Sequence, residues 1–297
     1  MSPARHVIAA IVNPVAGRRT MLPRVQRIQK LLRLRGATLD ILLTQAPGDA
    51  QRLAEGIGSE VEALLVAGGD GTAGEVVNGL GPAAPPLLLF RAGTENLAAR
   101  EFGMPVDPAE VVETLLDSPA IRCDLGEING RRFLAIAGIG FDAECVMRMS
   151  RVRRGHITHA DYFWPLWRAF WAYGFPALRF EADGQVIFDG RGLAIIGNIS
   201  RYSVGMQLLP DAQFDDGLLN LGVFPCSTRI GLVRHSVSAL LAGKGGERRA
   251  PSWRFRELRV TSCDAVPIEI DGEFGGRLPA TCRVLPNRIR LLAGARR

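Results

Sequence analysis

The chain has 297 residues, more than one typical hydrophobic core requires, and this length indicates two domains. Its formal net charge is +6, and its 36 basic residues include only two lysines, Lys30 and Lys244. Neither lysine completes a G-x-x-x-x-G-K-[ST] motif or lies in a V-A-I-K strand, so the sequence excludes P-loop and protein-kinase folds. No uninterrupted apolar stretch reaches about 18 residues, which argues against a conventional membrane span.

The cysteines and the first residues bear on the compartment. Five cysteines are scattered along the chain without a C-x-x-C pair, which is typical of reduced thiols and indicates neither a disulfide framework nor a zinc site. The apolar run at residues 7–12 is too short for the core of a signal peptide. We therefore expect a cytoplasmic protein.

Residues 1–125 are predicted to form an α/β domain. Short aliphatic strands at residues 7–12, 38–43, 61–67 and 86–90 alternate with amphipathic helices, a pattern typical of βαβ units and a parallel sheet. The first helix is predicted near residues 22–32, where apolar side chains recur on one face.

Residues 126–297 are predicted to form a β-rich, mainly antiparallel domain. The sequence leaves open whether the last residues return to the first domain. Asp-Gly pairs at residues 183–184, 189–190, 216–217 and 271–272 indicate tight turns between strands. One helix is predicted at residues 228–241.

The run Gly68-Gly69-Asp70-Gly71-Thr72 lies between a predicted buried strand and a helix expected at residues 75–80. Glycines at such a turn let backbone N–H groups approach phosphate oxygens, and the helix N-terminus adds positive potential. A carboxylate at Asp70 would repel a bare phosphate, which points to a divalent cation between them. Two alternatives stay open: a purely structural turn, and a dinucleotide fingerprint (Gly69, Gly71, Gly74) with Glu95 as its ribose acid.

Residues 148–180 combine arginines with aromatic side chains. Arg148, Arg151, Arg153 and Arg154 precede a stretch that holds Trp164, Trp167 and Trp171. Arginine beside interfacial aromatics suits the surface of a membrane with anionic lipid, whereas the same spacing also suits a helix that buries its aromatics. Single-stranded nucleic acid could also use such residues, but the chain has no nucleic-acid-binding motif, and we expect no such partner.

Five runs together resemble the diacylglycerol kinase catalytic family, whose relatives include sphingoid-base and ceramide kinases and bacterial lipid kinases. They are Asn13-Pro14-Val15-Ala16-Gly17, the run at residues 68–72, Gly93-Thr94-Glu95-Asn96-Leu97-Ala98, the loop at residues 209–218, and Ile270-Asp271-Gly272-Glu273. NAD kinases and phosphofructokinases share the second run, but the opening and closing runs are similar to the lipid kinases. The resemblance implies an ATP- and Mg²⁺-dependent lipid kinase with its active site in the cleft between two domains.

The resemblance also implies roles for single residues. Glu273 would be the general base, Asp70 would serve the Mg²⁺-phosphate, and Asp124 would be a second active-site carboxylate. A structural Mg²⁺ would be held by Asp216 and the backbone carbonyls of Gln213 and Leu218. The nucleotide would be contacted by Asn13, Thr44, Gly68, Gly69, Asp70, Gly71, Thr72, Ala73, Gly74, Gly93, Thr94 and Asn96.

The chain departs from the family pattern in its third run. Arg91 stands where the family usually has proline, and Leu97 stands where it has an aspartate, so one carboxylate of the nucleotide network is missing. Arg91 is either a cation near the phosphates or a surface arginine. The run Gly138-Ile139-Gly140-Phe141-Asp142-Ala143 is common in the family's C-terminal domain, and we expect it to shape the acceptor side.

We therefore expect a kinase that transfers the γ-phosphate of ATP to the hydroxyl of a lipid such as diacylglycerol. An NAD kinase and a catalytically weak lipid-binding protein are the alternatives. The expected partners are a lipid substrate and, through residues 148–180, transient contact with the inner face of the membrane. The acceptor lipid is not identified by the sequence, and a homodimer is left open.

Overall fold

The computed structural model describes residues 6–17, 21–91, 96–152, 163–202, 206–242 and 251–292. The chain divides into two compact units, of which the first contains residues 1–124 and 287–297 and the second contains residues 125–286. The predicted fold class, a parallel α/β domain followed by a mainly antiparallel β-rich domain, is confirmed. Among the described residues, no helix has the length and apolarity needed to cross a bilayer.

The N-terminal unit is built on a parallel sheet with the strand order β15-β4-β3-β1-β2. Its elements are β1 (Val7–Val12), α1 (Leu22–Leu34), β2 (Thr38–Leu43), α2 (Asp49–Glu55), β3 (Ala63–Gly68), α3 (Asp70–Gly79), β4 (Leu87–Arg91), α4 (Leu97–Glu101), α5 (Pro108–Asp117) and the first part of β5 (Ala120–Ile128). The end of β15 (Ala280–Leu292) completes this sheet beside β4.

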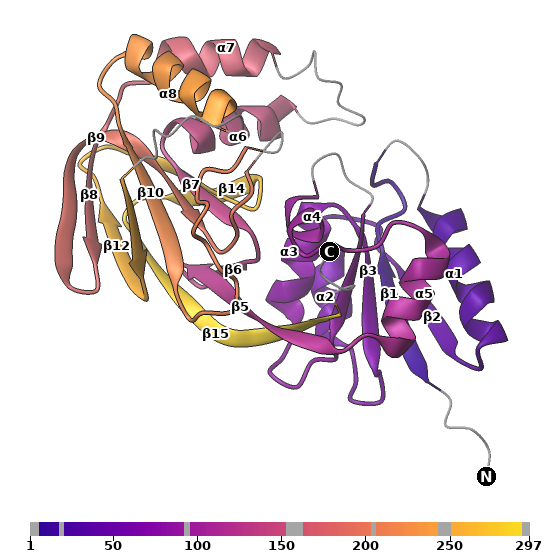
Figure 1. Ribbon diagram of the computed structural model, residues 1–297. Coiled ribbons are helices and arrows are strands. Elements are labelled where there is room, and N and C mark those ends of the chain that lie inside the picture. Colours follow the sequence, from indigo (N-terminus) through magenta and orange to yellow (C-terminus); the bar gives the residue numbers. More distant parts are fainter. Residues whose placement is uncertain are drawn as a thin grey trace. The chain divides into compact units, whose positions relative to one another are not determined.

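Helices cover both faces of this sheet. Helix α1 packs with α5, and α2 packs with α3 (Figure 1). The strands β3 and β4 are buried almost throughout, as their runs of aliphatic residues predict for strands with a helix on each side. The loops that follow β1, β3 and β4 therefore leave the same edge of the sheet, where an α/β fold places its ligands.

In the C-terminal unit, the described residues form mainly antiparallel strands, together with three helices. Its elements after β5 are β6 (Arg131–Phe133), β7 (Ile136–Ile139), α6 (Phe141–Val152), α7 (Phe163–Ala172), β8 (Ala177–Ala182), β9 (Gln185–Gly197), β10 (Leu219–Pro225), α8 (Arg229–Ala242), β11 (Ser252–Phe255), β12 (Glu257–Thr261), β13 (Pro267–Ile270), β14 (Glu273–Arg277) and β15. The long strand β9 pairs with β8 through its first half and with β7 and β10 through its second half. Phe133, Phe180 and Phe255 lie fully buried in the core of this unit.

The predicted Asp-Gly turns hold at two of the four positions. Asp183-Gly184 joins β8 to β9 and Asp271-Gly272 joins β13 to β14, each with both residues at positive φ, as a two-residue hairpin turn requires. Asp216-Gly217 lies in the loop before β10. The fourth prediction was wrong because Asp189 and Gly190 continue β9, where Asp189 forms an ion pair with Arg179 of the neighbouring strand (2.6 Å).

The start of α8 contacts the end of α7, and both helices are drawn in the upper part of Figure 1. Arg229 at the start of α8 donates a hydrogen bond to the carbonyl oxygen of Trp171 (2.7 Å), and its guanidinium lies 5.2 Å from the centroid of the Trp171 ring. The two helices leave six large apolar side chains between 47% and 83% exposed, namely Trp164, Trp167, Trp171, Ile230, Val233 and Val237. We call these six residues the α7–α8 patch. Arg153 and Arg154 lie outside the described residues.

Candidate functional site

The glycine run forms the junction between β3 and α3. Gly68 is the last residue of β3, Gly69 is the N-cap of α3, and the helix begins at Asp70, five residues before the predicted start. The first N–H groups of a helix have no partner within the helix, so they face outward at Asp70, Gly71 and Thr72. Asp70 is therefore part of a helix N-terminus, where a carboxylate is favourable and a phosphate can bind.

Close packing explains why the strand ends in glycine. A Cβ atom added at Gly68 would lie 2.5 Å from the Cβ atom of Thr72, whose side chain is buried. Thr72 Oγ1 in turn accepts a hydrogen bond from Nδ2 of Asn13 (3.2 Å), the residue that follows β1. The structure thus brings three of the predicted nucleotide residues together at one edge of the sheet.

Arg91 and Asn96 lie on the far side of the same junction. Both line a small cavity with Gly68, Gly69 and Asp70. Asn96 is buried and adopts a left-handed backbone conformation (φ 49°) as the N-cap of α4. Between these two residues, Gly93 and Thr94 lie outside the described part of the chain, so their predicted contacts are not placed.

The environment of Arg91 bears on its two interpretations. Its Nε atom is buried and, among the described residues, has no hydrogen-bond partner. Burial and then the charge of Arg100 lower the pKa of the Arg91 guanidinium. An arginine that is partly buried beside another arginine lacks the solvation of an ordinary surface residue, and an anion at the glycine turn would be favourable beside it.

Thr44, Ala73 and Gly74 are the remaining predicted nucleotide residues that the structure describes. Thr44 follows β2, and its N–H and hydroxyl groups both donate to the carbonyl oxygen of Val12 (3.0 and 3.5 Å). Ala73 is buried in the first turn of α3, and the carbonyl oxygen of Gly74 accepts a hydrogen bond from Asn78 (2.8 Å). The bonds of Thr44 join the ends of β1 and β2, whereas the bond of Asn78 lies within α3.

Asp124 is almost completely buried, at 1% exposure, near the end of the N-terminal unit. Its Oδ1 atom accepts a hydrogen bond from the backbone N–H of Asn287 (2.6 Å). This contact fastens the returning end of β15 to β5, which is a structural role. The catalytic role that the resemblance implies for Asp124 stays a prediction.

Glu273 begins β14 directly after the Asp271-Gly272 turn in the C-terminal unit. Its side chain is 38% exposed, and Oε2 forms an ion pair with Arg131 (2.6 Å). Arg131 also donates to the carbonyl oxygen of Phe274 (3.1 Å), so the guanidinium fixes the carboxylate against the strand. No described residue forms a hydrogen bond with the other carboxylate oxygen, Oε1.

In the loop predicted to hold a structural Mg²⁺, the carboxylate of Asp216 contacts a backbone N–H group and an arginine. Asp216 Oδ1 accepts the N–H of Leu218 (2.9 Å), and Oδ2 forms an ion pair with Arg254. The guanidinium supplies positive charge where the cation was expected, and the described residues include no cluster of three or more metal-binding side chains. Arg254 thus occupies one oxygen of Asp216, and the Mg²⁺ site at Gln213, Asp216 and Leu218 stays a prediction.

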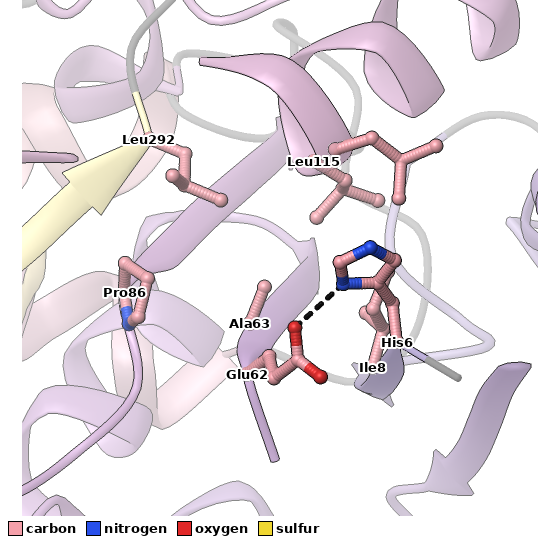
Figure 2. Close-up of a pocket in the computed structure, with 8 residues that line it drawn as sticks. His6, Ile8, Glu62, Ala63, Pro86, Leu115 and Leu292 are labelled. Atoms are coloured by element: carbon pink, nitrogen blue, oxygen red, sulfur yellow. Dashed lines mark hydrogen bonds and ion pairs between the residues drawn. The ribbon is translucent and has the colours of Figure 1, made fainter. Parts of the chain in front are cut away.

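A separate cavity lies at the opposite edge of the parallel sheet (Figure 2). It is lined by residues at the amino ends of β1 and β3, where His6 and Glu62 form an ion pair (2.7 Å). Its volume is about 110 Å³. It lies at the amino ends of the parallel strands, whereas the glycine run lies at their carboxyl ends.

Comparison with known proteins places the chain in a family. A family profile described as "Diacylglycerol kinase catalytic domain" matches residues 7–128, and one described as "YegS C-terminal NAD kinase beta sandwich-like domain" matches residues 135–293. The chain is 32% identical to a "Probable lipid kinase YegS-like" of Pseudomonas fluorescens, over 94% of this chain and 96% of the relative. It is 27% identical to a "Diacylglycerol kinase" of Staphylococcus carnosus, over 95% of this chain and 93% of the relative.

Solved structures agree on the fold. A putative diacylglycerol kinase from Bacillus anthracis superposes with a TM-score of 0.79 over 99% of each chain at 23% identity. The family models and the curated relatives identify the chain as a lipid kinase. The chain belongs to the diacylglycerol kinase catalytic-domain family, as its sequence motifs predict.

Proposed function

We propose that the chain transfers the γ-phosphoryl group of ATP to the hydroxyl group of a lipid such as diacylglycerol. The observation that carries this proposal is the junction at residues 68–72, where the N-terminus of α3 and the guanidinium of Arg91 offer positive potential to a phosphate group. The lipid acceptor is supported by the relatives of similar length that are named diacylglycerol kinase.

Asp70 is the residue we assign to a Mg²⁺ ion that accompanies the nucleotide. One carboxylate together with phosphate oxygens is a usual environment for Mg²⁺, which keeps several of its waters. The bound ion would supply charge neutralisation at the phosphate oxygens. Asn13 and Asn96, which flank the junction, would orient the nucleotide through their side-chain amides.

Glu273 is the proposed general base. Transfer of a phosphoryl group to an alcohol needs a carboxylate within hydrogen-bond reach of the hydroxyl group, besides positioning and charge stabilisation. Arg131 restrains the carboxylate at Oε2, so Oε1 would accept the hydroxyl proton. The proposal thus assigns nucleotide binding to the N-terminal unit and proton abstraction to the C-terminal unit.

We also propose that the α7–α8 patch meets the membrane during catalysis. Aromatic and aliphatic side chains stand exposed on both helices, and two arginines lie over tryptophan rings, Arg168 over Trp164 (5.7 Å) and Arg229 over Trp171 (5.2 Å). Tryptophan and arginine together suit an interface that contains anionic lipid, because the rings enter the headgroup region and the cations remain near phosphate.

A labelling experiment with three arms tests the kinase function. The protein is incubated with γ-labelled ATP and Mg²⁺ in the presence of diacylglycerol vesicles, of NAD, or of neither. The proposal predicts label in the lipid fraction alone. Label in NAD would instead favour an NAD kinase. If neither lipid nor NAD is labelled but the protein still sediments with vesicles, a lipid-binding protein is favoured.

Co-sedimentation tests the membrane contact. Replacing Trp164, Trp167 and Trp171 together by alanine is expected to reduce binding to vesicles that contain anionic lipid, and binding of the wild type should weaken as salt screens the arginines. Leu34 on α1, 83% exposed, provides a matched control, since Leu34→Ala also removes an exposed apolar side chain. Equal binding of the triple variant and the control would refute this assignment.

A further inference from the structure

Two acidic side chains meet inside the C-terminal unit. Glu269 lies in the middle of β13 and is 1% exposed, and Asp142 lies in the first turn of α6, which packs against β13 and β14. The absence of a side chain at Gly138 of β7 leaves room for both. A Cβ atom at Gly138 would lie 2.6 Å from Oδ2 of Asp142 and 2.9 Å from Oε1 of Glu269. The two carboxyl groups therefore converge over one glycine.

Among the described residues, no cation forms an ion pair with Asp142 or Glu269. Asp142 forms a hydrogen bond with the phenol of Tyr202. The other titratable groups that act on the pair are the thiol of Cys145 and the carboxylate of Asp271. Two nearby arginines are engaged elsewhere, Arg131 with Glu273 and Arg148 with Glu144.

The hydrogen bonds of Glu269 divide between its two oxygens. Oε2 accepts the backbone N–H of Gly272 (2.8 Å), whereas Oε1 is buried and has no N–H or O–H donor among the described residues. A proton between Glu269 and Asp142 would satisfy Oε1 and remove the repulsion. In agreement, burial and then the charge of Asp142 raise the pKa of Glu269 well above its usual range, and burial raises the pKa of Asp142.

Glu269 is connected to the proposed base through the β13–β14 turn. Asp271 and Gly272 occupy the turn at φ values of 47° and 81°, and Glu273 follows immediately. The carboxylate of Asp271 accepts the N–H groups of residues 134, 135 and 136 (2.8, 3.0 and 3.0 Å), which fixes one side of the turn. The hydrogen bond from Gly272 to Glu269 fixes the other side.

We propose that Asp142 and Glu269 share one proton, and that the protonated pair positions the Asp271-Gly272 turn and, with it, Glu273. Glu269 is thus a positioning residue, because it touches the turn rather than the reacting atoms. The positioning half of this inference rests on the proposed function, whereas the shared proton does not.

The variant Glu269→Gln tests the shared proton without any activity measurement. Its carbonyl oxygen can still accept the N–H of Gly272, and its amide supplies Asp142 with the hydrogen that the proton supplies in the wild type. An acid whose pKa is raised by folding costs native stability as the pH rises above its unfolded pKa, about 4.3 for glutamate. The Tm of Glu269→Gln should therefore exceed that of the wild type by a margin that grows between pH 5 and pH 8.

Glu75 offers a matched control. Like Glu269, it accepts backbone N–H groups, in its case those of Gly48 (2.8 Å) and Ala50 (3.1 Å). Unlike Glu269, it has no contact with a second acid among the described residues. Glu75→Gln should give no margin that grows with pH. The shared proton would be overturned if the Tm difference between Glu269→Gln and the wild type stayed constant with pH. It would also be overturned if the Tm difference for Glu75→Gln grew with pH by the same amount. Asp142→Asn should repeat the behaviour of Glu269→Gln.

Kinetics test the positioning role. Glu269→Ala removes the acceptor for Gly272, so kcat should fall at least tenfold while KM for ATP changes less than twofold, and Glu269→Gln should restore most of kcat and keep it at alkaline pH. A folded Glu269→Ala variant with wild-type kcat would refute the role. If the wild type phosphorylates no lipid, the proposed function fails, and the Tm series still decides the shared proton.

Discussion

The substitution Gly68→Ala probes the packing that builds the candidate nucleotide site. The new Cβ atom would lie 2.5 Å from Cβ, 2.6 Å from Oγ1 and 2.7 Å from Cγ2 of Thr72. Because the Cβ atom of Thr72 is attached directly to the helix backbone, rotation of its side chain cannot relieve the clash. The first turn of α3 must then move away from β3, and Asp70 must move with it.

Overpacking of this kind typically costs about 1–3 kcal/mol. At about 3 °C per kcal/mol, the Tm of the variant should fall by about 3–9 °C. Affinity for ATP should fall as well, because the N–H groups that start α3 are displaced. Differential scanning calorimetry and titration with a fluorescent ATP analogue measure the two effects.

Two further variants make the test specific. Gly81→Ala is the control, since a Cβ atom at Gly81 would meet nothing within 4 Å, and it should leave both Tm and affinity unchanged. Thr72→Gly removes the clashing atoms and should recover part of the Tm lost in Gly68→Ala when the two are combined. A Gly68→Ala protein with wild-type Tm and ATP affinity would refute the packing argument.

Two other predictions concern charge at the sites. Arg91→Gln should weaken ATP binding by about 10–100-fold, because it removes a charged hydrogen bond to phosphate. The affinity for adenosine, which has no phosphate, should change little. Equal losses of affinity for ATP and adenosine in the titration would contradict a phosphate contact. If Mg²⁺ binds the Asp216 loop, a Mg²⁺ concentration of 100 times the Kd should stabilise the wild type by about 2.7 kcal/mol. Arg254→Ala should bind Mg²⁺ more tightly, because it removes the cation beside Asp216. A Tm that does not change with Mg²⁺ in either protein would rule the site out.

The sequence predicts most of the N-terminal fold because its signals are local. Continuous aliphatic runs mark β1, β3 and β4, and the structure has these strands within two residues of the predicted bounds. The start of α3 was harder to predict. Glycines at residues 69 and 71 disfavour a helix by propensity, yet packing of Thr72 and Ala73 against the sheet starts the helix at Asp70.

The parts of the candidate sites that could not be predicted depend on contacts between distant residues. The ion pair of Asp216 with Arg254 joins side chains 38 residues apart, and the meeting of Asp142 with Glu269 joins two different elements. One signal for Glu269 was available, because a glutamate in the apolar run of β13 must be buried. The acid that it meets could not be identified from one sequence.

The central claim is that Glu273 acts as the base in phosphoryl transfer to a lipid, and one pair of measurements on Glu273→Gln tests it most directly. The turnover of γ-labelled ATP with diacylglycerol vesicles is compared with ATP affinity in the same variant. Loss of the base should lower kcat by about 10²–10⁴-fold and leave the Kd for ATP unchanged. Full transfer of label to lipid by Glu273→Gln would contradict the assignment.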